Sequence, residues 1–201
     1  MAIKLYDAIP SSNSDRVKIL LHEKGLTYER VTLDLKKLEQ KRPAFLRLNP
    51  YGKVPVLDDN GKILFESCII NEYLDEQYPN PPFMPRDPYL RGRARVLTDY
   101  GINHLQDSYT PLRLEMLKKI EDRDRGVIDG AVKGIFDRLQ YLESALGDKP
   151  YLVGDISLVD IDIVTRFLRL HQWSLFPAPA LPKLSAWFNR MISRPSVKPF
   201  V

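Results

Sequence analysis

The sequence contains very little cysteine, since Cys68 is the one cysteine among 201 residues. It therefore excludes an internal disulfide framework and a metal site built from cysteine ligands. Long apolar runs are also missing, and no stretch approaches the roughly 20 residues that cross a bilayer. The opening segment MAIKLYDAIP has no apolar stretch long enough for a signal peptide. We therefore expect a cytoplasmic protein, because a reducing compartment suits such a chain.

A strong excess of one charge is absent as well. Lys and Arg number 30 and Asp and Glu number 26, which leaves a net charge of +4. This excess is too small to predict a nucleic-acid partner, although it suits a small anionic ligand. Hydrophobic residues at 44% and charged residues at 28% are the balance of a globular protein with a real core. The length allows one large domain or two small ones.

The first 78 residues carry the pattern of a small α/β domain. Alternating apolar and polar residues indicate short strands, and apolar residues at helical spacing indicate helices between them. Asp59-Asn60-Gly61 is typical of a tight hairpin turn, and Gly25 of a helix end. The expected elements are strands at 3–7, 28–33, 54–57 and 63–65, a helix ending at Gly25, a short helix within 34–48, and a helix over 68–76 that Ser67 caps.

Proline then marks a change of architecture. Four of the eight residues from Tyr78 to Pro85 are proline, which excludes a helix and predicts a linker over 79–88. Beyond it, residues 89–201 are predicted to form an all-helical domain, and Pro111 is expected to kink or interrupt its first helix. The candidate helices cover 91–117, 126–146, 157–170 and 184–192.

One helix start in the second half of the sequence has a clear capping signal. Ser157 and, three residues later, Asp160 form the pattern of a capping box. Because such a box satisfies free amides at a helix N-terminus, we interpret it as a folding signal rather than a binding site. Loss of the Ser157 hydroxyl is expected to cost about 1 kcal/mol of stability.

Several motifs occur in one order and spacing along the whole chain. These are Ser11-Ser12-Asn13 with Arg16-Val17, Gln40-Lys41, Asn49-Pro50-Tyr51-Gly52-Lys53-Val54-Pro55, Phe65-Glu66-Ser67, the proline-rich linker and Ser157-Leu158-Val159-Asp160. Together they resemble the cytosolic glutathione S-transferase superfamily, in its serine-type (phi-, tau- and zeta-like) branches. The resemblance implies a thioredoxin-like N-terminal domain, an all-α C-terminal domain and glutathione as co-substrate, with no metal.

The resemblance also implies a role for individual residues. Glu66 and Ser67, at a helix N-terminus, would bind the γ-glutamyl end of glutathione, where free amides favour a carboxylate. Val54 and Pro55 would join through a cis peptide bond and present the Val54 main chain to the cysteinyl backbone. The glycine end would be bound by Gln40, Lys41 and Lys53, although Gln40 replaces a residue that is often histidine in the plant-type branch.

The thiol of glutathione needs a group that favours the thiolate. Ser11 lies just before the first helix and five residues before Arg16, as in the serine branches. Other branches place the serine four residues before, which would make Ser12 the activating residue. Tyr6 stands too early to be the tyrosine of the tyrosine branches. Cys68 lies inside a helix, where we expect a buried small apolar residue, so disulfide chemistry at an enzyme thiol is disfavoured.

Family resemblance places a small hydrophobic electrophile in a cleft lined by residues after the linker. The candidates by position are Tyr100, His104 and Tyr109, followed by Trp173 and Phe176. The expected function is conjugation of the glutathione thiolate to such an electrophile, a detoxification reaction. Most proteins of this fold are homodimers, and we expect Phe83 and the exposed proline-rich segment to contribute to the dimer contact.

A second resemblance points to a different function. The segments from Glu66 to Pro85 and from Lys149 to Asp160 resemble bacterial stringent starvation protein A, which has the same fold and binds RNA polymerase. Its Pro-His-Pro element corresponds here to Pro79-Asn80-Pro81, with asparagine in place of histidine. This difference, together with Ser11 and Gln40-Lys41, favours the enzyme. A glutathione-dependent isomerase, lyase or peroxidase, or simple ligand carriage, are further alternatives.

Overall fold

The computed structural model describes residues 3–201, which divide into two compact units. The first unit contains the residues up to Phe83 together with Pro195–Phe200, and the second contains Met84–Arg194. The expected α/β and all-helical parts are both present. The C-terminal segment Pro195–Phe200, which we expected in the helical domain, belongs to the first unit, as do residues 79–83 of the expected linker.

A four-stranded mixed sheet forms the centre of the first unit. Its order is β2-β1-β3-β4, with β1 (Ile3–Asp7) parallel to β2 (Glu29–Thr32) and antiparallel to β3 (Val56–Asp59). The strand β4 (Lys62–Phe65) returns antiparallel to β3. Asn60 and Gly61 join them with positive φ angles of 53° and 87°, which confirms the predicted hairpin turn.

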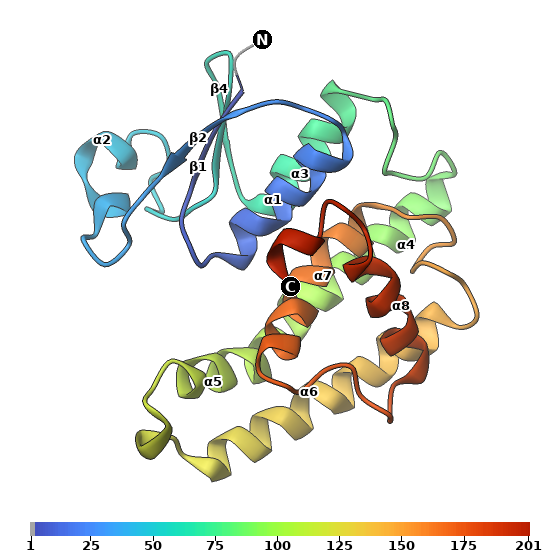
Figure 1. Cartoon of the computed structure of the whole chain (residues 1–201). Coiled ribbons are helices and arrows are strands. Elements are labelled where there is room, and N and C mark those ends of the chain that lie inside the picture. Colours follow the sequence, from blue (N-terminus) through green and yellow to red (C-terminus); the bar gives the residue numbers. More distant parts are fainter. Residues whose placement is uncertain (1–2) are drawn as a thin grey trace. The chain divides into compact units, whose positions relative to one another are not determined.

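Helices cover the two faces of this sheet unequally (Figure 1). The helices α1 (Ser12–Glu23) and α3 (Ser67–Gln77) lie side by side on one face, and the short α2 (Pro43–Leu46) lies on the other. Side chains of β1 alternate between the faces, so Leu5 and Asp7 are fully buried while Tyr6, directed to the opposite face, is half-buried. One face is thus a closed core and the other is partly open.

Helix α3 begins differently from the prediction. Its N-cap is Glu66, with φ 69° and ψ 107°, and Ser67 is its first helical residue. The expectation that Ser67 caps the helix is therefore wrong. A non-glycine residue with this backbone conformation costs on the order of 1–3 kcal/mol, and such residues cluster at functional sites. The helix start is consequently a place to look for a ligand.

Apart from two isolated β-bridges between Tyr151 and Asp155, the second unit is built of helices. They are α4 (Pro88–Asp99), a π-helical turn at Tyr100–His104, α5 (Gln106–Met116), α6 (Arg125–Leu146), α7 (Leu158–Gln172) and α8 (Pro182–Ile192). Helix α7 is the central one, since most of its residues are buried, and Phe167 at its middle contacts the rings of Phe176, Trp187 and Phe188. Phe176, a weak candidate for the electrophile site, is thereby part of this core.

The interruption of the first long helix is not at Pro111. Helix α5 runs through Pro111, and the irregularity is the π-helical turn that precedes it. At Gly101 in this turn, a Cβ atom would lie 2.5 Å from the Ile163 side chain of α7. Only glycine allows the two backbones to approach so closely. The irregular turn therefore coincides with a close contact between this segment and α7.

Phe83 is buried, with 5% of its surface exposed, so little of its side chain is available for the dimer contact that we expected there. Its amide donates to the Asp75 carboxylate, and the Lys24 ammonium lies 5.3 Å from its ring centroid. Lys24 in turn forms an ion pair of 2.7 Å with Asp75 and donates to the carbonyl of Pro81. These contacts fasten the proline-rich segment up to Phe83 onto the first unit.

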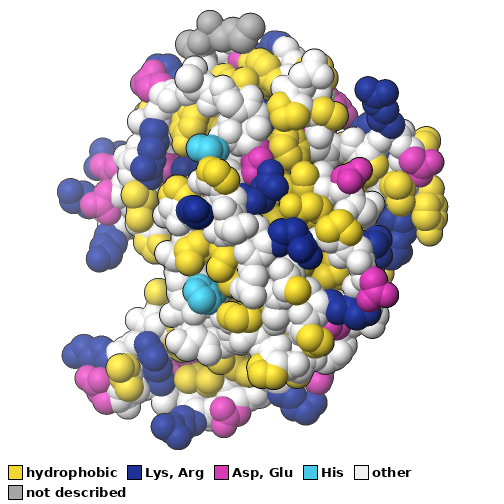
Figure 2. Space-filling model, turned by 45° about the vertical axis from the view of Figure 1, so that its right-hand side comes forward, with side chains coloured by type: hydrophobic (Ala, Val, Ile, Leu, Met, Phe, Trp, Pro, Cys, Tyr) yellow, Lys and Arg dark blue, Asp and Glu magenta, His cyan; other side chains and the backbone are white. Residues whose placement is uncertain are grey.

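The surface shows no concentration of one charge on the face drawn in Figure 2. Lys and Arg side chains alternate there with Asp and Glu side chains. Within residues 3–201, no helix has both the length and the hydropathy that a membrane span needs. Over the same residues, no cluster of histidine, cysteine and acidic side chains has the arrangement of a metal site.

Candidate functional site

Ser11 is the N-cap of α1, and its hydroxyl oxygen caps the first turn of the helix. The Ser11 Oγ accepts a hydrogen bond from the Ser14 amide at 3.3 Å and another from the Ser14 hydroxyl at 3.0 Å. Both bonds use the oxygen as an acceptor, which leaves the hydroxyl hydrogen of Ser11 available to a ligand. Since Ser11 is only half-buried, a ligand at the helix N-terminus would meet a polarised hydroxyl and the positive end of the helix dipole.

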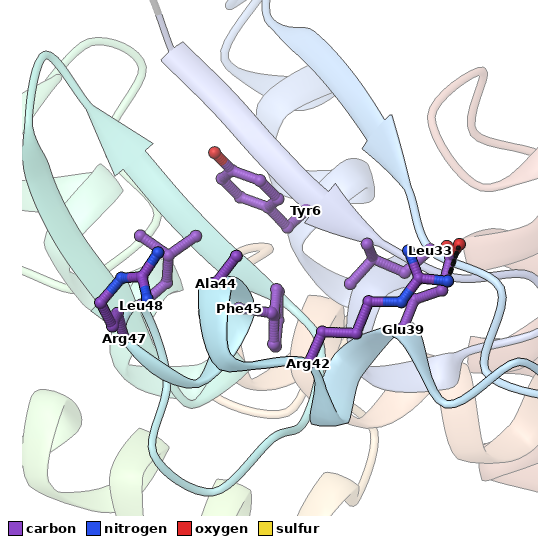
Figure 3. A pocket seen from close by; sticks show the side chains of 8 residues that line it. All are labelled: Tyr6, Leu33, Glu39, Arg42, Ala44, Phe45, Arg47 and Leu48. Atoms are coloured by element: carbon purple, nitrogen blue, oxygen red, sulfur yellow. Dashed lines mark ion pairs between the residues drawn. The ribbon is translucent and has the colours of Figure 1, made fainter.

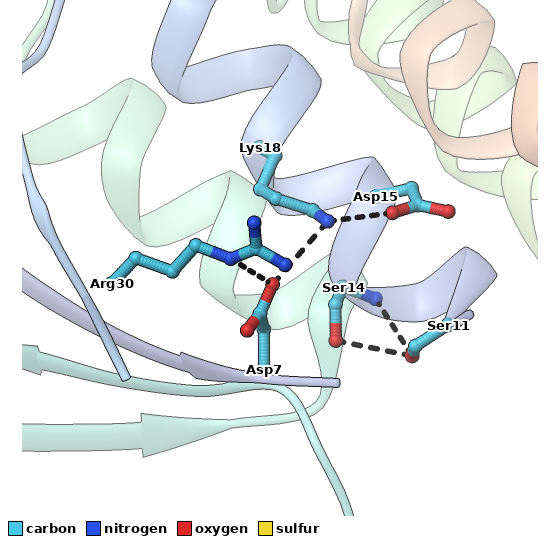
Figure 4. A network of polar contacts seen from close by, with 6 residues as sticks. All are labelled: Asp7, Ser11, Ser14, Asp15, Lys18 and Arg30. Atoms are coloured by element: carbon cyan, nitrogen blue, oxygen red, sulfur yellow. Dashed lines mark hydrogen bonds and ion pairs between the residues drawn. The ribbon is translucent and has the colours of Figure 1, made fainter. Parts of the chain in front are cut away.

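A buried charge network anchors the helix that carries Ser11 (Figure 4). Asp7, fully buried at the end of β1, accepts from the Arg30 Nε at 2.8 Å and pairs with the Lys18 ammonium at 3.3 Å. Lys18 also pairs with Asp15 at 2.7 Å. The network joins β1, β2 and α1, so it fixes the position at which α1 begins. The remaining oxygen of Asp7, Oδ1, has no hydrogen-bond partner in the described part of the chain.

Arg16 joins the beginnings of α1 and α3. It is 1% exposed, and its Nη1 donates to the Ser67 Oγ at 2.6 Å. The same nitrogen contacts the Cys68 Sγ at 3.5 Å. Ser67 thus resembles Ser11, because a donor on α1 occupies its oxygen while its own hydrogen remains available. Cys68 is half-buried rather than fully buried, and its sulfur faces a guanidinium.

The loop before β3 is held in shape by its own side chains. The side-chain Nδ2 of Asn49 donates to the Lys53 carbonyl at 2.7 Å, and the Lys41 ammonium donates to the Tyr51 carbonyl at 3.0 Å. At Gly52, with φ 58°, a Cβ atom would lie 2.8 Å from the Gln40 carbonyl oxygen, so only glycine fits. The loop therefore brings Gln40 and Lys41 next to Lys53.

Pro55 follows this loop, and the Val54–Pro55 peptide bond is cis, as the resemblance implies. Outside the helices and strands of residues 3–201, the Val54 amide and carbonyl make no main-chain hydrogen bond. The Gln40 Oε1 is buried and has no partner within the same residues. A buried polar atom without a partner, such as this Gln40 oxygen, is uncommon in native structures, and a bound ligand would satisfy it.

The three electrophile-site candidates have different environments. Tyr100 donates to the Arg138 carbonyl at 3.1 Å and stacks on His104, with 5.2 Å between ring centroids. The side chain of His104 is 63% exposed. Tyr109 is only 3% exposed and lies beneath the Arg166 guanidinium, and burial raises the pKa of its hydroxyl. Tyr100 and His104 therefore remain accessible, whereas Tyr109 belongs to the interior of the second unit.

Comparison with known proteins assigns the family. Residues 1–76 match the model of the glutathione S-transferase N-terminal domain, and residues 105–195 match that of the C-terminal domain. The chain belongs to the glutathione S-transferase superfamily. Ser11, Gln40, Lys41, Lys53–Pro55, Glu66 and Ser67 all lie in the first matched region, whereas Tyr100 and His104 lie between the two.

Relatives carry two different names within this superfamily. Glutathione S-transferase U19 of Arabidopsis thaliana is 37% identical over 96% of this chain and 86% of its own length. A stringent starvation protein A homolog of Pasteurella multocida is 32% identical over 90% of this chain and 81% of its own length. A theta class glutathione S-transferase of Xanthomonas axonopodis with glutathione bound is similar in structure, with a TM-score of 0.87, 28% identity and coverage of 99% and 96%.

Sequence reasoning missed part of the candidate site of this glutathione S-transferase superfamily member. It did not identify Ser14 as the donor to Ser11, or Asp7 as the anchor of α1. A signal was available for Ser14, because it stands three residues after an N-cap serine, where capping partners are found. Arg16 was noted as part of a motif, but a basic residue on the otherwise apolar face of α1 gave no indication of its partner across the fold.

Proposed function

We propose that this protein is a glutathione transferase in which the Ser11 hydroxyl stabilises the glutathione thiolate. The observation that carries the proposal is the pair of hydrogen bonds from Ser14 to the Ser11 Oγ. They leave the Ser11 hydrogen as a donor at the N-terminus of α1. A thiol of ordinary pKa near 8.5 has to be lowered by about one to two units to ionise at pH 7, at about 1.4 kcal/mol per unit. One charge-assisted hydrogen bond and a helix dipole are of this size.

The rest of the tripeptide would be bound by groups on the same unit. The γ-glutamyl carboxylate would accept from the Ser67 hydroxyl and the first amides of α3, with the Glu66 carboxylate near the ammonium. The cysteinyl backbone would pair with the free main chain of Val54 beside Pro55. Gln40, Lys41 and Lys53 would bind the glycine carboxylate, which the positive charges of the two lysines would attract.

The acceptor would be a small hydrophobic electrophile, with the exposed His104 and the half-buried Tyr100 available for contact to it. We place Tyr109 behind them as a supporting core residue. Attack of the thiolate on the electrophilic carbon forms the new S–C bond. In a substitution, the bond to the displaced group breaks and its electron pair leaves with that group. In an addition to a double bond, the π bond breaks and its electron pair takes up a proton from water. No metal takes part in this proposal. We further propose a cytoplasmic homodimer.

Replacement of Ser11 by alanine tests the proposal. Because Ser11→Ala removes the thiolate donor but no contact to the rest of the tripeptide, kcat/KM should fall by one to three orders of magnitude. The Kd of glutathione should change less than about threefold. The measurements are conjugation of an aryl halide and calorimetric titration with glutathione.

Ser12→Ala is the matched control, since Ser12 is the neighbouring alternative. It should retain most of the activity. If Ser12→Ala loses the activity and Ser11→Ala keeps it, Ser12 is the activating residue. If the wild-type protein takes up no glutathione, the proposed function is wrong.

The stringent starvation protein A homolog among the relatives supports a second candidate, an RNA polymerase-binding regulator without conjugating activity. The two functions separate in one experiment. Retention on immobilised glutathione with turnover supports the enzyme, whereas co-purification of polymerase subunits without glutathione binding supports the regulator.

A further inference from the structure

The segment Pro195–Phe200 belongs to the first unit and lies along α1, which it contacts at two points. The Ser196 hydroxyl donates to the carboxylate of Glu23, the last residue of α1. The Phe200 ring lies 5.2 Å from the Lys18 ammonium, at the middle of the helix. The segment therefore runs antiparallel to α1, from the end of the helix toward its beginning.

The Lys18 ammonium joins the two stretches of chain on either side of Ser11 (Figure 4). It pairs with the Asp7 carboxylate at 3.3 Å, at the end of β1, and with the Asp15 carboxylate at 2.7 Å, in the first turn of α1. The Asp15 amide in turn donates to the Ser11 carbonyl at 2.8 Å. A displacement of the Lys18 ammonium would therefore be passed to both flanks of this serine.

Phe200 covers this ammonium with an aromatic ring. Only 9% of the Lys18 side chain is exposed, whereas Arg30, which also binds Asp7, is 38% exposed. An aromatic face attracts an ammonium that lies within about 6 Å of the ring centroid. Because the attraction between opposite charges grows where water is excluded, the ring strengthens both ion pairs of Lys18. Phe200 thus helps to fix the beginning of α1.

We propose that Phe200 is a positioning residue for the Ser11 hydroxyl and acts through Lys18. The inference rests on the proposed function, because it gives Phe200 a part in stabilising the thiolate. Without the ring, water would reach the Lys18 ammonium, its ion pairs would weaken, and the first turn of α1 would hold the hydroxyl less firmly. A misdirected donor forms a weaker hydrogen bond, so the thiolate would be less stable. Binding of the rest of the tripeptide would not change, since its proposed partners lie outside this network.

The first test is amide hydrogen exchange in the full-length protein without ligand. The Ser14 and Asp15 amides report on Ser11 directly, because they donate to its hydroxyl oxygen and its carbonyl. Phe200→Ala should speed the exchange of both amides by about fivefold or more. Phe200→Tyr keeps the aromatic face and should restore the wild-type rates. Ser196→Ala is the matched control, since it removes the other attachment of the segment to α1, and it should leave both rates unchanged.

The second test measures conjugation of an aryl halide and the pKa of the bound glutathione thiol, from thiolate absorbance against pH. Phe200→Ala should raise this pKa by about half a unit, which lowers kcat about threefold at a pH below it. The rates of Phe200→Ala and wild type should converge at high pH, and the Kd of glutathione should stay the same. In a Lys18→Met background, Phe200→Ala should have no further effect, because the ring acts through the ammonium.

Three results would overturn the proposal. The first is unchanged exchange at Ser14 and Asp15 in Phe200→Ala. The second is an equal acceleration in Ser196→Ala, which would assign the effect to the attachment of the segment rather than to Lys18. The third is a further loss of activity when Phe200→Ala is added to Lys18→Met. If the wild type binds no glutathione, the proposed function fails, and the exchange rates alone still decide whether Phe200 fixes the position of Ser11.

Discussion

The helices α1 and α7 both have a serine N-cap, but the hydroxyl hydrogens of the two serines have different partners. At α7, the Ser157 hydroxyl donates to the Asp160 carboxylate at 3.0 Å, and both residues are buried. At α1, the Ser11 oxygen accepts from Ser14, and Ser11 is half-buried. Asp160 and Ser14 occupy the same position, three residues after the serine. The residue at that position therefore decides whether the serine hydrogen is consumed or available.

This comparison separates a structural cap from a candidate catalytic one. Asp160 accepts four hydrogen bonds, from the Leu152 amide, the Trp187 indole, and the amide and hydroxyl of Ser157. The carboxylate thus fixes three segments of the second unit and leaves nothing for a ligand. At α1, a second serine replaces the carboxylate, so the first turn satisfies its amides while one donor remains open.

The largest effect is expected from removing the acceptor at α7. Asp160→Ala leaves three N–H groups and one hydroxyl without a buried partner, which should lower the free energy of unfolding by about 4 kcal/mol. Ser157→Ala removes one of these donors and should cost about 1 kcal/mol. Urea unfolding measures both. A loss below 1 kcal/mol in Asp160→Ala would contradict the role of Asp160 as the centre of this network.

The Asp160 carboxyl should also make the free energy of unfolding depend on pH. Burial raises the pKa of its carboxyl from 3.8 to about 6, against the lowering effect of its hydrogen bonds. At pH values between 3.8 and about 6, Asp160 is protonated in the folded protein but ionised in the unfolded chain. The stability from this group is therefore complete below about pH 4 and is lost as the pH rises through 6, by about 3 kcal/mol in total.

The check is urea unfolding of wild type and Asp160→Asn from pH 4 to 7.5. The asparagine variant cannot titrate, so the difference between the two free energies should shrink by about this amount as the pH rises. A difference that stays constant across the range would show that Asp160 is ionised in the folded state throughout.

The smallest effect is expected at Ser14. Ser14→Ala keeps the amide that bonds to Ser11 but removes the hydroxyl donor, so Ser11 becomes a weaker donor itself. We expect kcat/KM to fall two- to tenfold and the pKa of bound glutathione to rise by up to about one unit, equivalent to about 1.4 kcal/mol. Thiolate absorbance against pH measures the shift. Ser157→Ala, a matched loss of a capping hydroxyl, should leave this pKa unchanged.

Local chemistry made much of the fold predictable from the sequence. The Asn60-Gly61 turn, the helix end at Gly25 and the Ser157–Asp160 box each act over a few residues, and the structure confirms all three. Glu66 was not predictable as the cap of α3, because its positive φ is imposed by the fold rather than by its own preference. Likewise, the need for glycine at position 101 depends on Ile163, some sixty residues away in the chain.

For the candidate site, the segments could be predicted from the sequence but the hydrogen bonds could not. The spacing around Ser11 and Val54-Pro55 identified the segments that form it. The direction of the hydrogen bonds to Ser11 and Ser67 could not be read from sequence, because it depends on donors that face these oxygens in three dimensions. The hollow beside α2 that Tyr6, Leu33 and Arg47 line (Figure 3) was not predicted either, because these residues come from separate elements.

The return of the chain's last residues to the first unit limits how this protein can be divided. Ser196 contacts Glu23, and the Phe200 ring lies 5.2 Å from the Lys18 ammonium, both on α1. A fragment that ends at Phe83 would lack Pro195–Phe200 and would expose the part of α1 that this segment covers. A chimaera that takes its helical unit from a relative therefore has to keep residues 195–200 of the chain that supplies the sheet. For the same reason, a C-terminal purification tag is better attached through a spacer.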